Sequence, residues 1–345
     1  MKVVLGMSGG VDSAAAAYLL KKAGHTVTGV TLVMKQDVQP DIDGAKKTAA
    51  LLGIAHEVID CTEAFQKYVL DDFAAEYRCG NTPNPCIVCN PMVKFASMLS
   101  YMEHIGYEAI ATGHYANVQK NVLDGRFELM RGADAAKDQS YMLYRLTQQQ
   151  LAHVLFPLAN MEKPAIRALA AQAGIMPQIP KDSQDICFLP NGDYAGFLSK
   201  EYAMTPKQGE FRLADGKVVG IHDGQWQYTV GQRKGLGISC GYPVYVTAKD
   251  AKQNLVMVGK EDELFASSCK IVRCNWIVAP SEQETYTAKI RYSRKEAAAK
   301  ITWMNETEAI LTFDVPQRAM TCGQSAVVYS GERVVGGGMI AQVIR

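Results

Sequence analysis

Near its start the chain reads Gly6-Met7-Ser8-Gly9-Gly10-Val11-Asp12-Ser13, between an apolar run, Lys2 to Leu5, and an Ala- and Leu-rich run, Val11 to Lys22. The first run predicts a buried strand, and the second predicts a helix that stops at Gly24. Adjacent glycines permit a tight turn and let a ligand approach the main chain. Because the N–H groups of such a turn and of the helix N-terminus point at one spot, this stretch predicts an anion site.

Two common phosphate loops are excluded by the spacing. The kinase and GTPase loop G-x-x-x-x-G-K-[ST] requires a Lys that is missing here, and the glycines lie too close together for G-x-G-x-x-G. The run Ser8 to Ser13 instead resembles the pyrophosphate (PP) loop of the ATP pyrophosphatases, which split ATP into AMP and pyrophosphate. Ser8 and Ser13 add hydroxyl donors, and Asp12 beside a phosphate is expected to need a bridging divalent cation such as Mg²⁺.

Length and composition predict a cytoplasmic protein of two or three domains without a membrane partner. The chain has 345 residues and no apolar stretch or leader pattern typical of a membrane span or a secreted protein. Its nine cysteines are then expected to be reduced, and to be catalytic or metal-binding. From residue 206 onward 18 Lys and Arg stand against 14 Asp and Glu, and the densest basic patch is Thr285 to Lys300. Such a patch is either a solvated face or a phosphate contact.

The pattern of apolar runs predicts an α/β fold followed by β-rich domains. Strands at about His25–Val33 and His56–Ile59 alternate with helices, which is typical of a parallel sheet. A helix is expected to run from Arg145 to Leu155. After about residue 203 short β-rich runs dominate. We expect a PP-loop (adenine nucleotide α-hydrolase-like) ATP-binding domain over 1–203, a small central β-rich domain over 204–266, and a C-terminal β-barrel over 267–345.

Three cysteines stand out. A rigid loop with two prolines delivers Cys86 and Cys89 to a helix expected at about Met92 to Ile105, where the helix N-terminus would lower their thiol pKa values. Cys187 lies on a polar loop between prolines. The Cys86-x-x-Cys89 pair fits zinc, a redox pair or an iron–sulfur site, and three thiolates would leave one metal coordination position open. Cys79 is either a fourth ligand or a bystander.

Taken together, the motifs resemble one family, the tRNA-specific 2-thiouridylases of the MnmA (TrmU) type. The matching motifs follow the family order and span nearly the whole chain: Gly6 to Ser13, Thr82-Pro-Asn-Pro-Cys86-x-x-Cys89-Asn90, Ala111-Thr-Gly-His-Tyr115, Lys137-Asp-Gln-Ser-Tyr141, Ser183-x-x-x-Cys187-Phe188, Gly231-Gln-Arg-Lys-Gly-Leu-Gly237, Arg291-Tyr292 and Gly323-Gln324-Ser325.

The resemblance implies an enzyme that adenylates the C2 oxygen of the wobble uridine of tRNA with ATP and then replaces it with sulfur. It implies that ATP is bound by Gly6, Met7, Ser8, Gly9, Gly10, Val11, Asp12, Ser13, Leu32 and Gly113. It implies that Asn84, Pro85 and Cys86 face the target base, and that tRNA also meets His114, Lys137, Asp138, Gln139, Arg291, Tyr292 and Gln324. Cys89 would be the nucleophile and Cys187 the persulfide-bearing residue, loaded by a sulfur donor such as a cysteine desulfurase or a sulfur-relay protein.

The sequence departs from the family at one position that bears on the chemistry. Many members carry Asp where this chain has Cys86, and the replacement creates the trio Cys86, Cys89 and Cys187. Three thiolates could hold a [4Fe–4S] cluster whose fourth iron binds sulfide. Two other readings are a PP-loop ligase that uses no sulfur, and a non-catalytic RNA-binding protein with a structural metal.

Overall fold

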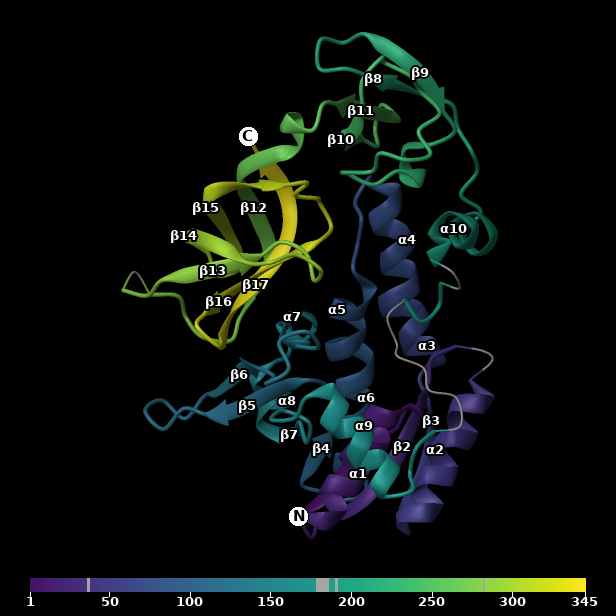
Figure 1. Ribbon diagram of the computed structural model, residues 1–345, viewed down its shortest axis with the longest axis vertical. Coiled ribbons are helices and arrows are strands. Elements are labelled where there is room, and N and C mark those ends of the chain that lie inside the picture. Colours follow the sequence, from purple (N-terminus) through teal and green to yellow (C-terminus); the bar gives the residue numbers. More distant parts are fainter. Residues whose placement is uncertain (36–37, 178–185, 190–191, 282) are drawn as a thin grey trace.

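The computed structural model describes residues 1–35, 38–177, 186–189, 192–281 and 283–345. Figure 1 shows three parts along the long axis: an α/β part that holds the N-terminus, a small β-sheet at the opposite end, and a barrel beside them. The predicted parallel-sheet domain followed by two β-rich parts is therefore confirmed. No helix in the described part of the chain is long and apolar enough to cross a membrane.

The N-terminal part is built on a parallel sheet. In the described residues its strand order is β3-β2-β1-β4-β7. The strands are β1 (Lys2–Gly6), β2 (Thr26–Val33), β3 (Ala55–Asp60), β4 (Ala109–Ala111) and β7 (Val154–Leu155). The prediction of one helix over residues 145–155 is wrong at its end, because Val154 and Leu155 pair with β4 instead.

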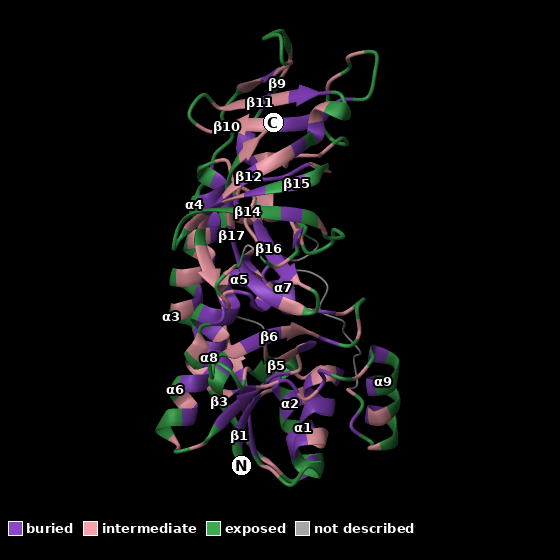
Figure 2. Cartoon of the chain, turned by 90° about the vertical axis from the view of Figure 1, so that its left-hand side faces the viewer, coloured by how far each residue is buried: buried purple, intermediate pink, exposed green. Residues whose placement is uncertain are grey.

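Helices cover both faces of this sheet. The helices of the N-terminal part are α1 (Val11–Lys22), α2 (Gln39–Leu52), α3 (Thr62–Phe65), α4 (Asp71–Arg78), α5 (Pro85–Cys89), α6 (Ala96–His104), α7 (Ser140–Leu143), α8 (Gln148–His153), α9 (Lys163–Gln172) and α10 (Tyr194–Tyr202), and not all of them contact the sheet. Val3 and Leu5 of β1 pack with α1, α2 and α9, whereas Val4 packs with α6 and α8 on the other side. Figure 2 shows β1 buried between these layers.

The helix that carries the paired cysteines is continuous from Pro85 to His104. Between α5 and α6 it passes through a π-helical segment, Asn90–Phe95, that contains Pro91. Proline has no N–H to donate to the preceding turn, so a wider turn accommodates it locally. A second π-helical segment, Gln66–Leu70, joins α3 to α4.

The rest of the chain is β-rich. A central sheet has the order β10-β11-β8-β9 in the described residues. Its strands are β8 (Gly209–Arg212), β9 (Val218–His222), β10 (Tyr245–Asp250) and β11 (Leu255–Gly259), with short 3₁₀ turns at Gln225–Gln227 and Asp262–Leu264.

The last strands close into a barrel, because β12 pairs with both β15 and β17. They are β12 (Phe265–Trp276), β13 (Tyr286–Lys289), β14 (Ala297–Asn305), β15 (Glu308–Arg318), β16 (Ser325–Ser330) and β17 (Arg333–Ile344). A hairpin of the N-terminal part, β5 (Ala116–Lys120) and β6 (Phe127–Arg131), adds to the edge of β17. The barrel thereby shares a sheet and a hydrophobic core with the α/β part.

Candidate active site

The glycine-rich loop between β1 and α1 is packed tightly against its neighbours. Gly9 has φ +73°, and a Cβ there would lie 2.6 Å from the Asp41 carbonyl oxygen at the start of α2. The Ser13 hydroxyl donates to the Gly10 carbonyl at 3.0 Å and accepts from the Ser8 N–H at 3.3 Å. The loop is therefore preformed, with two hydroxyls at the N-terminus of α1, where the partial positive charge of the helix favours an anion.

The Asp12 carboxylate is held by protein groups. The Lys163 ammonium, on the first residue of α9, donates to its two oxygens at 2.7 and 2.8 Å, and the Tyr115 hydroxyl donates at 2.7 Å. Lys163 thus places a positive charge beside this carboxylate. Gly113 brings the strand end of β4 against the same turn, since a Cβ there would lie 3.0 Å from the Asp12 carbonyl carbon.

The paired cysteines lie in the first turn of a helix that begins at Pro85, earlier than the predicted start near Met92. The Asn84 side chain caps this helix by accepting from the Cys86 N–H at 3.2 Å. The Cys89 side chain is buried, with its Sγ 3.8 Å from the Met34 Sδ beyond the end of β2. Leu32, expected to contact ATP, is half-buried near the end of the same strand.

The prediction of lowered thiol pKa values is wrong for both residues. Burial raises the pKa of Cys86, and it raises the pKa of Cys89 to about 12, although Lys94 acts in the opposite direction. The cost of placing a thiolate in an apolar environment exceeds the stabilisation from the helix N-terminus and the nearby ammonium. In this conformation both groups are protonated thiols at neutral pH.

Cys187 is exposed and lies close enough to Cys86 and Cys89 to act on both electrostatically. Lys35 donates to its carbonyl oxygen. Burial lowers the pKa of the Lys94 ammonium, but the three thiols raise it by more, so the net direction is upward. The Lys94 ammonium therefore lies near all three cysteines. The neighbouring residues 181–185, with Ser183 of the motif, lie outside the described residues.

The cysteine trio does not form a metal site in this conformation. Among the described residues, no group of three or more His, Cys, Asp or Glu side chains is placed to hold a metal ion. All nine cysteines lie in the described part of the chain and are free thiols, Cys79 among them. Cys89 is buried whereas Cys187 is exposed, and in this conformation the three thiols are not placed to hold one metal ion.

Several residues expected to touch tRNA are engaged within the protein. The buried Asp138 carboxylate accepts from the Gly132 and Ser140 N–H groups at 3.1 and 3.2 Å and from the Ser140 hydroxyl at 2.8 Å. Gln139 accepts from the Tyr115 N–H at 3.0 Å. Burial, followed by Lys94, lowers the pKa of His114 to about 3, so this ring is neutral; its Nδ1 lies 2.8 Å from the Thr112 hydroxyl. Lys137 is half-buried.

Loop residues of the barrel form hydrogen bonds with the loop around Thr82, which precedes the cysteine helix. The Gln324 amide donates to the Thr82 carbonyl at 2.7 Å, and the Thr82 N–H donates to the Cys322 carbonyl at 2.9 Å. Gly323 has φ +90°, and a Cβ there would lie 2.8 Å from the Thr82 nitrogen. Only glycine allows this close approach of the two loops. The motifs around Asn84 and Gln324 therefore form one structural unit.

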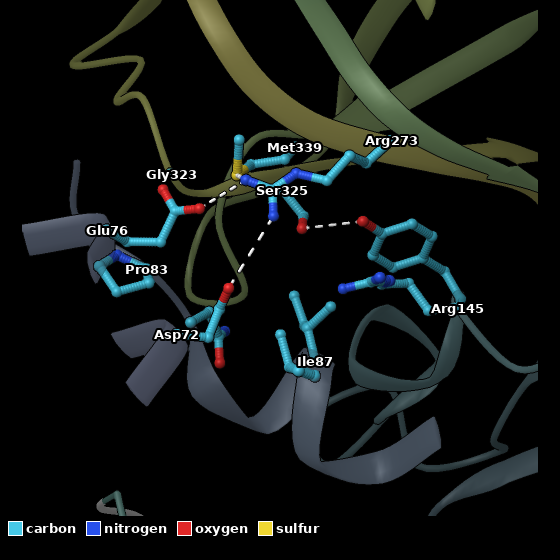
Figure 3. Close-up of a pocket in the computed structure, with 12 residues that line it drawn as sticks. Asp72, Glu76, Pro83, Ile87, Arg145, Arg273, Gly323, Ser325 and Met339 are labelled. Carbon is cyan, nitrogen blue, oxygen red and sulfur yellow. Dashed lines mark hydrogen bonds and ion pairs between the residues drawn. The ribbon is translucent and has the colours of Figure 1, made fainter. Parts of the chain in front are cut away.

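A small pocket lies beside this junction. Figure 3 shows Arg273 reaching from the barrel toward Glu76 and Asp72 of α4. The space has a volume of about 30 Å³, which is room for water and not for a nucleotide. Its ion pairs fix the barrel against the α/β part.

Arg291 and Tyr292 follow strand β13 of the barrel. The Arg291 guanidinium donates to the Val230 carbonyl at 3.1 Å and to the Thr321 hydroxyl, so it joins the barrel to the central part. Tyr292 is 36% exposed and lies 5.9 Å from Tyr141, measured between ring centroids. This ring is open to a partner.

Sequence reasoning missed Lys163, Tyr115 and Lys94. Lys163 lies 151 residues from Asp12 along the chain, and nothing near either residue signals the contact. Lys94 follows Cys89 by five residues, which is the spacing of one π-helical turn. The contact was missed because an ordinary α-helical spacing of three or four residues does not place these two residues on one face.

Comparisons with known proteins agree with the motifs. Three family models match in succession: a tRNA methyl transferase HUP domain over residues 1–191, a tRNA methyl transferase PRC-barrel domain over residues 196–260 and an aminomethyltransferase beta-barrel domain over residues 266–340. The chain is 43% identical to the tRNA-specific 2-thiouridylase MnmA of Treponema denticola, over 100% of this chain and 99% of that protein.

Two further relatives match over almost their whole length. The chain is 42% identical to the tRNA-specific 2-thiouridylase MnmA 1 of Caldanaerobacter subterraneus subsp. tengcongensis, over 100% of this chain and 99% of the relative. It is 43% identical to the tRNA-specific 2-thiouridylase MnmA of Acidithiobacillus ferrooxidans, over 98% of each chain. Full-length identity at this level, with the ordered motifs and the fold, shows that the chain belongs to the tRNA-specific 2-thiouridylase MnmA family.

Proposed function

We propose that this protein is a tRNA 2-thiouridine synthase, a tRNA sulfurtransferase that uses ATP to activate the C2 oxygen of the wobble uridine and then replaces that oxygen with sulfur. The observation that carries the proposal is the arrangement of the cysteine helix. Its first turn holds Cys86 and Cys89, Cys187 lies beside it, and the barrel loop of Gln324 closes over its start. A phosphate loop and a set of thiols in one domain suit both halves of this reaction.

The first half is adenylation. ATP is proposed to bind Gly6, Met7, Ser8, Gly9, Gly10, Val11, Asp12, Ser13, Leu32 and Gly113. The uracil oxygen attacks the α-phosphorus and pyrophosphate leaves, which turns a poor leaving group into AMP. N–H and hydroxyl groups of the preformed loop stabilise the charge that grows on the departing pyrophosphate. Asp12 acts by positioning this turn, since Lys163 and Tyr115 occupy its carboxylate.

The second half is sulfur transfer. The terminal sulfur of a persulfide on Cys187 attacks C2 and AMP leaves. The bond between the two persulfide sulfurs must then break, and attack by the Cys89 thiolate on the inner sulfur leaves a Cys89–Cys187 disulfide and the thiouridine. A reductant of the thiol class must reopen that disulfide before the next turnover. The exposure of Cys187 supports its role as the residue that a sulfur donor, such as a cysteine desulfurase or a sulfur-relay protein, can reach.

The Cys89 thiol has to lose its proton for this step. Lys94 is the nearby cation that favours the thiolate. Cys86 and Cys89 would give up their buried, protonated state when the target base and the Cys187 loop displace the apolar contacts around them. Cys86 faces the base where many relatives have Asp, and its thiol cannot reproduce a carboxylate.

The tRNA contacts are proposed to be of two kinds. Lys137, Arg291 and Tyr292 present cationic or aromatic side chains, and Asn84, Pro85 and Cys86 line the entry of the flipped base. Asp138, Gln139, His114 and Gln324 form hydrogen bonds within the protein, and they position the RNA-facing backbone. We divide the chain for this purpose into a catalytic domain at 1–203, a central domain at 204–266 and a barrel domain at 267–345. Mg²⁺ is proposed to enter with ATP.

The test measures pyrophosphate release and 2-thiouridine formation with substrate tRNA. The expected result is pyrophosphate release that depends on tRNA, and a Cys187→Ala variant that still binds ATP but forms no thiouridine. Pyrophosphate release independent of tRNA would identify a ligase acting on another substrate, and no release would leave an RNA-binding protein. Full thiolation by Cys187→Ala would refute the persulfide route. Iron content of protein purified without oxygen separates that route from a cluster: about four irons per chain would favour a [4Fe–4S] cluster.

A further inference from the structure

A second pocket lies where the three parts of the chain meet. Its volume is about 490 Å³, within the range of about 300–1,000 Å³ typical of ligand sites. One wall is Tyr194 of α10, a second is the segment 229–232 of the central part, and the third consists of Arg291, Arg294 and Arg318 of the barrel. The site is therefore built from all three parts.

The walls are held together by specific contacts. The Arg291 guanidinium donates to the Val230 carbonyl across the pocket wall. Gly231 has φ +91°, and a Cβ there would lie 3.0 Å from the Ala319 side chain. Segment 229–232 of the central part therefore packs closely against the barrel. Tyr194 donates through its hydroxyl to the Gln227 carbonyl at 2.8 Å. The pocket is a formed concavity and not a loose gap between domains.

The charge around this pocket is one-sided. Among the described residues that line it, three are arginines and none is acidic. Burial lowers the pKa of Arg291, and the like charges of the neighbouring Arg294 and Arg318 lower it further. The Arg291 Nε is buried and has no hydrogen-bond partner within the described structure. Like charges brought together in a concave wall create a strong attraction for an anion.

Within the described residues Arg318 pairs with one carboxylate, that of Glu261, which is exposed to solvent. Its Nε donates to a Glu261 carboxylate oxygen at 3.1 Å, and the Glu261 side chain is 58% exposed. Exposed pairs of this kind contribute little, because water and salt screen them. An incoming anion can therefore replace Glu261 at Arg318 at small cost.

We propose that this pocket binds a backbone phosphodiester of tRNA, with Arg294 and Arg318 as contacts in addition to Arg291, which also positions the wall. Arginine suits this role because its planar fork matches two phosphate oxygens at once. RNA is favoured over ATP as the source of the phosphate, because no residue of the phosphate loop lines the pocket. The inference rests on the proposed function and adds to it a contact far from the reacting base.

The experiment measures tRNA affinity over a series of salt concentrations for the full-length protein. Arg294→Ala and Arg318→Ala are each expected to weaken binding roughly three- to tenfold, and to lower the magnitude of the salt slope by about 0.7 to 1. Lys252→Ala is the matched control, since it removes an exposed cation outside the pocket and should leave affinity and slope nearly unchanged. ATP affinity should stay at its wild-type value in all three variants.

Glu261→Gln supplies the discriminating test. If Arg318 contacts a phosphate, removal of its competing carboxylate tightens tRNA binding, roughly two- to threefold. If Arg318 only holds the fold together, the same change loosens the structure and does not tighten binding. Arg318→Lys should recover part of the affinity, because the charge returns without the fork.

The outcomes separate this inference from the proposed function. A wild-type salt slope in both Arg→Ala variants, or a loss of ATP affinity in place of tRNA affinity, overturns the pocket assignment. If the wild-type protein still thiolates tRNA while the pocket assignment fails, the proposed function stands without the pocket. Wild-type protein that neither binds nor thiolates tRNA would instead refute the proposed function itself.

Discussion

Replacing Lys163 with Met would test the ion pair at the phosphate loop. The change keeps most of the side-chain length and removes the ammonium that lies 2.7 and 2.8 Å from the two Asp12 oxygens. Removing one partner of a buried pair costs about 3–5 kcal/mol. The Lys163 side chain is 9% exposed but that of Asp12 is 32% exposed, so water compensates part of the loss. We expect the variant to lose about 2–3 kcal/mol of stability.

For a domain of this size such a loss corresponds to a fall in melting temperature of roughly 5–10 °C. The assay is thermal unfolding of wild type, Lys163→Met, Asp12→Asn and the double variant, followed by fluorescence. Asp12→Asn keeps an oxygen for the Tyr115 hydroxyl, and it should cost less than Lys163→Met. In the double variant no charge is left unpaired, so its loss should be smaller than the sum of the two single losses by about 1 kcal/mol or more. Strict additivity would refute the reasoning, because it would mean that the two charges do not interact.

Three further results are expected. At pH 8 the Cys89 thiol, with a pKa of about 12, should be thiolate in only about one molecule in ten thousand, so iodoacetamide should label exposed Cys187 first; equal labelling in a peptide mass map would contradict this. Gln324→Ala should lower the free energy of unfolding by about 1 kcal/mol and speed hydrogen–deuterium exchange of the amides in the loop around Thr82. Unchanged exchange would mean that the Gln324–Thr82 hydrogen bond does not hold this loop. The hydrogen bond from Arg333 lowers the pKa of Glu284, so the stability that it adds is present above the unfolded-state pKa and is lost as pH falls through the folded-state pKa. Arg333→Met should therefore make the free energy of unfolding fall less steeply below about pH 5 in acid titrations. The same pH dependence in wild type and variant would mean that the Arg333–Glu284 pair adds no stability.

Local patterns were sufficient for the main architecture. The strand before Gly6, the adjacent glycines and the Ala-rich helix each follow from residues a few positions apart, and all three were predicted. The change to short alternating runs after residue 203 likewise marked the β-rich parts. The basic patch was found from composition alone, and Arg291 and Arg294 of that patch line a pocket in the structure.

The failures concern effects that depend on the folded environment. β7 has only two residues, and its pairing with β4 decides its conformation where local propensity favours a helix. The thiol pKa of Cys89 was predicted from its place at a helix N-terminus, but burial dominates, and burial is a property of the whole packed domain. Lys163 meets Asp12 only because α9 lies against α1, which no local pattern encodes.

The contact between barrel and catalytic part bears on how RNA recognition is linked to chemistry. Interfaces between domains are often loose enough to permit relative motion. Here β17 pairs with β6, the Tyr141 hydroxyl donates to the Ser325 carbonyl at 2.8 Å, and Gln324 holds the loop before the cysteine helix. A strand pairing, a buried hydrogen bond and a loop clamp together oppose sliding of the two parts. If tRNA binds the barrel as proposed, these contacts would hold it at a fixed place relative to Cys89, and the proposed RNA site would also set where the target base arrives.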